Sequence, residues 1–81
     1  MKKSEILIKE LLTETSHQRA NAAMALGNIK CQNAVQPLIE VLGNGSDSLQ
    51  RQAAISLYEI TRQSFGKDQE KWLEWWNKEK R

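Results

Sequence analysis

Residues 19–42, with the sequence RANAAMALGNIKCQNAVQPLIEVL, decide the fold, because they contain two helical patterns joined by a short turn and this unit recurs along the chain. When the sequence is aligned with itself at an offset of 31 residues, apolar positions coincide, among them seven pairs of identical residues. These pairs are Leu7/Leu38, Ile8/Ile39, Leu11/Leu42, Ala22/Ala53, Ala23/Ala54, Leu26/Leu57 and Ile29/Ile60. A fixed period of roughly 20–50 residues is typical of stacked helix pairs. The sequence therefore predicts a short α-solenoid.

The length and composition of the chain predict one small helical domain. It has 81 residues, of which 40% are hydrophobic and 27% charged, and it contains a single proline. Its apolar runs are shorter than the roughly 20 residues of a membrane span, and Lys9 and Glu10 interrupt the first of them, so we expect neither a membrane segment nor a signal peptide. One cysteine, Cys31, excludes an internal disulfide and favours a cytoplasmic location. A net charge of +2 is too small to indicate nucleic acid.

The apolar periodicity predicts five antiparallel helices, near residues 4–13, 16–30, 34–43, 47–64 and 68–79. We divide the single domain, residues 1–81, into three parts. They are an N-terminal capping helix (1–14), a first repeat (15–44) and a second repeat (46–78) that ends in a Trp-rich capping helix.

In the last expected helix, Trp72-Leu73-Glu74-Trp75-Trp76 copies the pattern of residues 38–42 at an offset of 34. The three tryptophans are therefore expected to cover the open end of the stack. The alternative is an aromatic hot spot for a partner. Gly27 lowers the helix propensity of its segment by about 1 kcal/mol, which suggests close packing by the next helix along the chain; local flexibility is the alternative.

The predicted core follows from positions that recur at helical spacing. Its members are Leu7, Leu11, Ala22, Leu26, Ile29, Leu38, Leu42, Ala53, Leu57, Ile60, Trp72 and Trp76.

Residues 19–29 (RANAAMALGNI) followed by residues 34–39 (AVQPLI) resemble a HEAT repeat, most closely the short bacterial type related to phycobilisome-lyase repeats. Residues 47–57 resemble the opening of a second repeat, and residues 61–76 the closing segment of many bacterial HEAT proteins. The resemblance covers residues 6–76. It implies a right-handed α-solenoid that serves as a protein-binding scaffold.

No constellation of residues indicates catalysis, a metal or a cofactor. His17 is the single histidine, whereas a zinc site needs about four ligands, and Cys31 has no Cys–His–Asn arrangement around it. Glu40 and Glu74 occupy matching places and are expected on one solvated face. We therefore predict that the protein is not an enzyme. The alternative, an accessory subunit of a chromophore or cofactor lyase, predicts a deep pocket lined by Cys31, His17 or Tyr58.

The favoured function is a protein–protein interaction module with an unidentified protein partner. In HEAT-like solenoids the second helix of each pair lines the contact face. By resemblance, this face comprises Glu5, Lys9, Gln36, Glu40, Glu74, Trp75 and Lys78. Nucleic-acid binding is the alternative from another class. The mixed charge of the face argues against it, because a phosphate backbone selects clustered Lys and Arg.

Self-association is the last expectation from the sequence. Ile6, Ile8 and Leu12 widen the apolar arc of the first helix beyond one stripe. We predict a homodimer through residues 4–13, with a monomer capped by polar side chains as the competing interpretation.

Overall fold

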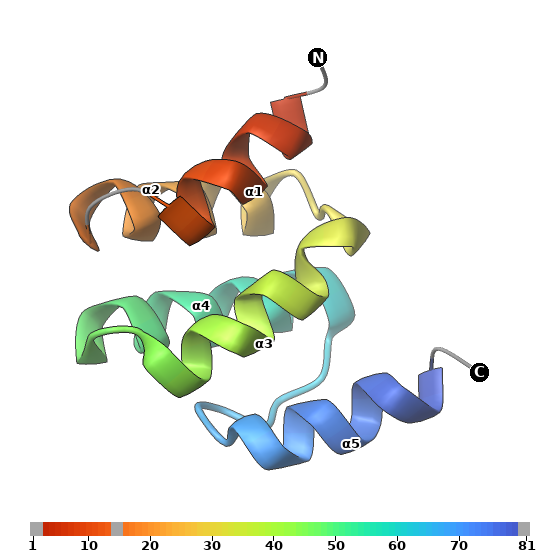
Figure 1. Cartoon of the computed structure of the whole chain (residues 1–81). Coiled ribbons are helices and arrows are strands. Elements are labelled where there is room, and N and C mark those ends of the chain that lie inside the picture. The colour runs from red at the N-terminus through yellow and green to blue at the C-terminus, as the bar shows by residue number, and fades with distance from the viewer. Residues whose placement is uncertain (1–2, 14–15, 80–81) are drawn as a thin grey trace.

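A computed structural model of the chain describes residues 3–13 and 16–79, and helices account for most of them. The elements are α1 (Lys3–Thr13), α2 (Ser16–Asn28), the 3₁₀ turn η1 (Gln32–Ala34), α3 (Val35–Asn44), α4 (Asp47–Thr61) and α5 (Gln69–Glu79). No strand is present in this part of the chain. Helices α1, α3 and α5 form one layer, and α2 and α4 form the other (Figure 1). This arrangement confirms the short all-α solenoid.

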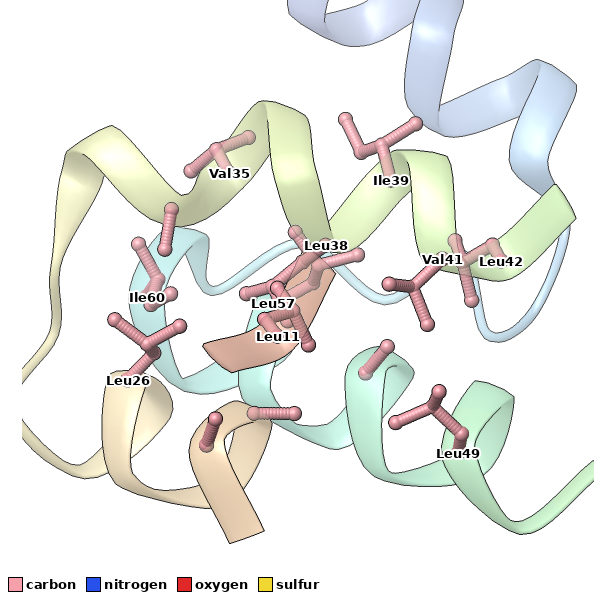
Figure 2. Packing of buried hydrophobic residues seen from close by; sticks show 14 of the residues in the cluster. Leu11, Leu26, Val35, Leu38, Ile39, Val41, Leu42, Leu49, Leu57 and Ile60 are labelled. Atoms are coloured by element: carbon pink, nitrogen blue, oxygen red, sulfur yellow. The ribbon is translucent and has the colours of Figure 1, made fainter. Parts of the chain in front are cut away.

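The helices pack in the order that the 31-residue offset indicates. Helix α1 packs on α2, α3 packs on α4, and α2 packs on α4, so the two helix pairs become one stack. Leu11, Leu38 and Leu57 converge from three helices at its centre (Figure 2). Each is fully buried, and burying a leucine side chain contributes about 1.5–3 kcal/mol.

The predicted core is buried with three exceptions. The prediction for Ile29 is wrong, because its side chain is 45% exposed. Helix α2 ends at Asn28, and the turn that follows places Ile29 at the surface, whereas α4 continues to Thr61 and keeps Ile60 buried. Leu7 and Trp76 are half-buried rather than part of the core. Six buried hydrophobic side chains were not predicted: Ala23, Ala34, Val35, Ile39, Val41 and Leu49.

Left-handed residues end α2 and α4 earlier than the sequence predicts. Lys30 has φ 52°, and the bonds Lys30 N–H to Gly27 C=O and Cys31 N–H to Leu26 C=O, both 3.1 Å, form a Schellman motif. Helix α2 therefore ends at residue 28 rather than 30. Arg62 has φ 63° and ends α4 at residue 61 rather than 64.

Helix α5 runs antiparallel to α3, as Figure 1 shows. At its start, the Gln69 side-chain amide donates to the Ile39 carbonyl (3.0 Å). Near its end, Trp76 Nε1–H donates to Gln36 Oε1 (3.3 Å). The expected alternation of helix direction holds from α1 to α4 and not at α5, so residues 72–76 and 38–42 do not occupy equivalent places.

The segment of residues 62–68 causes this reversal. It runs from the C-terminal end of α4 back to the N-terminal end of α4, where α5 begins (Figure 1). There Lys67 Nζ lies 2.9 Å from Asp47 Oδ1, at the start of α4. The offset of 34 exceeds the repeat offset of 31 by three residues. These extra residues belong to the connection that runs back along α4.

Candidate functional site

The predicted contact residues all lie in the layer formed by α1, α3 and α5. Those on α1 are Glu5 and Lys9, those on α3 are Gln36 and Glu40, and those on α5 are Glu74, Trp75 and Lys78. All are exposed except Trp75, which is half-buried. Because α1 packs on α3 and the residues on these two helices are related by the 31-residue offset, they form two matching rows.

The reversed α5 separates Glu74 from Glu40. Glu74 is two residues from Trp76, whose indole contacts Gln36, whereas Glu40 is next to Ile39, whose carbonyl binds the start of α5. The two glutamates therefore do not occupy the matching places that the sequence pattern suggested. Among the described residues, no group of three or more His, Cys, Asp or Glu side chains could hold a metal ion.

Four aromatic side chains gather where α5 meets the segment before it. Trp72 is fully buried, and its Nε1–H donates to the Gly66 carbonyl (2.8 Å). The ring of Phe65 meets Trp72 edge-on at a centroid distance of 4.9 Å. The ring centroids of Trp75 and Trp72 lie 6.0 Å apart. Trp75 and Trp76 are both half-buried. Trp72 thus serves the core, and Trp75 lies where the cluster reaches the surface.

Trp75 lines an open hollow of about 420 Å³. The other residues that line it are Phe65, Lys71, Glu74 and Lys78. Residues 71, 74, 75 and 78 share one face of α5, so helical spacing brings three predicted contact residues together. The sequence prediction missed Phe65 and Lys71, although the spacing of Lys71 was a usable signal.

A second hollow, of about 230 Å³, lies between α4 and the segment that follows it. It is lined by Ala54, Ile55, Tyr58, Gln63, Ser64 and Gly66. Cys31 is half-buried and lines neither hollow, and the side chain of His17 lies outside the described residues. Of the residues named for a lyase-type pocket, Tyr58 lines this second hollow, which is open to solvent.

A family model for HEAT repeats matches residues 4–71. The chain belongs to the HEAT-repeat family. No curated protein and no solved structure matches it. HEAT repeats commonly mediate protein–protein interaction and are typically non-catalytic. The match identifies HEAT repeats in general and does not extend to the phycobilisome-lyase type. None of the helices described is long and apolar enough to cross a membrane.

The Arg19 side chain of α2 contacts the C-terminal ends of both α1 and α3, a role that the sequence did not reveal. Its Nε–H donates to the Leu11 carbonyl at the end of α1 (2.7 Å), and its Nη2 lies 3.4 Å from Asn44 Oδ1 at the end of α3. A cation at helix C-termini is favourable because it faces the negative end of the helix dipole. Gln50, 31 residues later, donates to the Gly45 carbonyl (3.1 Å), so both repeats use this position for a backbone contact.

Proposed function

We propose that this HEAT-repeat chain is a non-catalytic protein–protein interaction module whose partner contacts the layer of α1, α3 and α5. The observation that carries the proposal is the Trp75 hollow, where a half-buried indole lies beside Phe65 and is surrounded by the charged side chains of Lys71, Glu74 and Lys78. Tryptophan is enriched among residues that dominate binding energy, and a polar rim around an apolar centre is the usual anatomy of an interface.

The charges on this layer favour a protein over a nucleic acid as the partner. Acidic and basic side chains alternate, with Glu5 and Lys9 on α1, Glu40 on α3, and Glu74 and Lys78 on α5. A phosphate backbone selects clustered Lys and Arg, because affinity there depends on the number of phosphates neutralised. A folded or extended polypeptide with charges of both signs fits better.

Charge reversal at Glu40 tests the proposal. The tagged chain is used to capture proteins from lysate of its native cells, each captured protein is purified, and its affinity is measured by calorimetry. The change Glu40→Arg reverses an exposed charge at the centre of the face, and we expect the dissociation constant of the partner to rise about tenfold or more.

The matched control is Glu59→Arg, the same reversal on α4 in the opposite layer, where Glu59 makes a surface ion pair with Lys30 at 3.8 Å. We expect this variant to bind the partner like the unmodified chain. Equal affinity of all three proteins would contradict the assignment of the face. A duplex DNA that binds the chain in a salt-dependent manner would favour the alternative class of partner.

We further propose that two copies associate through residues 4–13. Ile6 and Leu12 on α1 are 44% and 46% exposed. Ile8 is half-buried, whereas its equivalent on α3, Ile39, is fully buried under α5. Covering such apolar surface contributes roughly 25 cal/mol per Å², and a two-fold dimer is the commonest way for identical chains to do so.

A further inference from the structure

The side of α4 that faces away from α2 is related, by the 31-residue repeat, to the side of α2 that α4 covers. Ala23 on α2 is fully buried there, and its carbonyl accepts a hydrogen bond from Ser56 Oγ of α4 (2.6 Å). Ala54, which follows Ala23 by 31 residues, is only half-buried and lines the open groove of about 230 Å³. On α2 the place equivalent to this groove is occupied by α4.

The groove has an apolar wall and a backbone wall. Ile55 and Tyr58 of α4 are 51% and 42% exposed beside it. Opposite them the chain returns through residues 63–66, and a Cβ built on Gly66 would meet no atom within 4 Å. The volume is below the roughly 300–1,000 Å³ of typical small-molecule pockets, which favours side chains of a docked helix as the occupant.

Two arginines flank this groove. Arg51 lies three residues before Ala54 on the same face of α4, and the Arg62 guanidinium lies 5.5 Å from the centroid of the Tyr58 ring. If α4 of a second copy docked here, Arg51 and Arg62 would meet arginines of that copy in either helix direction. Asp47 pairs with Arg51 (3.7 Å) and with Lys67 (2.9 Å), but these four side chains, Arg62 included, keep a net positive charge beside the groove. The charges therefore disfavour self-pairing and select an occupant with acidic ends.

We propose that an amphipathic helix of a partner protein docks in this groove, in the place on α4 that α4 itself occupies on α2, with a small residue over Ala54 and acidic residues near Arg51 and Arg62. The position of Gly27 on α2 corresponds to Tyr58 on α4. The partner helix consequently crosses α4 at a greater distance than α4 crosses α2, and it rests on the ring of Tyr58. This surface is separate from the α1, α3 and α5 layer.

A peptide derived from α4 provides the probe. It comprises residues 46–62 and carries Arg51→Glu and Arg62→Glu, so it keeps the apolar stripe that packs on α2 and has acidic ends. The unmodified peptide is the matched control, with the same stripe and basic ends. Each fluorescent peptide is titrated with the full chain. We expect saturable binding of the acidic peptide, accompanied by a gain in helical circular dichroism, with affinity about tenfold or more above that of the control.

Two protein variants locate the binding site. Ala54→Arg fills the groove and is expected to abolish binding of the acidic peptide. The control Glu70→Arg, at an exposed residue of α5 that lines neither hollow, is expected to leave it unchanged. A chain carrying Arg51→Glu and Arg62→Glu keeps Ala54, and we expect it to prefer the unmodified peptide. This reversal tests the proposal even if Ala54→Arg disturbs folding. Equal affinity for both peptides, no binding of either, or no change of preference in the charge-reversed chain would overturn it.

Discussion

Gly27 sets the distance between α2 and α4. A Cβ at this position would lie 2.7 Å from Ser56 Oγ and 2.9 Å from Ser56 Cα, closer than side-chain carbons approach other atoms. Ser56 is itself buried, and its hydroxyl is satisfied by the Ala23 carbonyl. The close packing that Gly27 suggested in the sequence is therefore present, and its neighbour is α4 rather than the next helix along the chain.

We expect Gly27→Ala to lower the free energy of unfolding by about 1–3 kcal/mol, because backbone must move to admit the methyl group, although alanine raises helix propensity by about 1 kcal/mol. Urea denaturation measures the difference. The control is Asn21→Ala, at an exposed residue of the same helix, where alanine only raises the helix propensity. Equal losses in both variants would contradict the role of Gly27.

Lys30 occupies a left-handed position that glycine adopts without strain. A non-glycine residue in this conformation costs roughly 1–2 kcal/mol, and the Lys30–Glu59 ion pair at 3.8 Å is exposed and compensates little. We expect Lys30→Gly to raise the free energy of unfolding by about 1 kcal/mol and to raise the melting temperature. A lower melting temperature would mean that the side chain of Lys30 stabilises the turn more than its backbone strains it.

At the scale of elements, the first four helices were predictable because local and repeated signals agree. Leu26 and Leu57 recur at the offset of 31 and are both buried, so the pattern reflects equivalent packing. The direction of α5 was not predictable. It depends on how residues 62–68 cross the stack, which is set by contacts distant in sequence, such as Lys67 with Asp47 and Gln69 with Ile39.

The candidate surfaces likewise contain residues that local spacing predicts and residues that only tertiary contacts bring together. Residues Glu74, Trp75 and Lys78 share one hollow because helical spacing alone places them together. Phe65 joins that hollow, and Ala54 lines the groove on α4, only because of the path taken between α4 and α5. Tertiary contacts of this kind leave no periodic signal in the sequence.

The contact between Lys67 and Asp47 gives the returning segment a dependence on pH. A hydrogen bond and the charge of Lys67 lower the pKa of Asp47 below its ordinary value of 3.8; burial opposes this, and the charge of Arg51 lowers the pKa by less than either. Because the pKa is lower in the folded than in the unfolded chain, the contact stabilises fully above pH 3.8. Its contribution is lost as the pH falls through the lowered pKa.

We expect Lys67→Gln to return the pKa of Asp47 toward 3.8, as followed by carboxyl chemical shifts in NMR during acid titration. The variant Lys71→Gln, which alters another exposed lysine nearby on α5, serves as the control and is expected to leave that pKa unchanged. An Asp47 pKa that does not respond to Lys67→Gln would show that the ion pair is not formed in solution.

At the scale of the whole molecule, the exposed apolar side chains on α1 predict that the protein is a dimer in solution. Light scattering at tens of micromolar is expected to give twice the chain mass of 9.3 kDa. The change Leu12→Lys places a charge in the proposed contact and is expected to restore the mass of one chain, while Met24→Lys, at a similarly exposed residue of α2, leaves the dimer intact. A mass of 9.3 kDa at every concentration would show that α1 is not a self-association surface.

Both binding proposals depend on two stacked helix pairs closed by a fifth helix that runs antiparallel to α3. Nuclear Overhauser contacts in the uniformly labelled chain test this arrangement most directly. We expect contacts from the Trp76 indole N–H to Gln36 and from the Gln69 side-chain amide to Ile39, because hydrogen bonds of 3.3 and 3.0 Å join these pairs. Contacts from Trp76 to Leu42, without any to Gln36, would place α5 parallel to α3 as in a regular repeat and would contradict the structure.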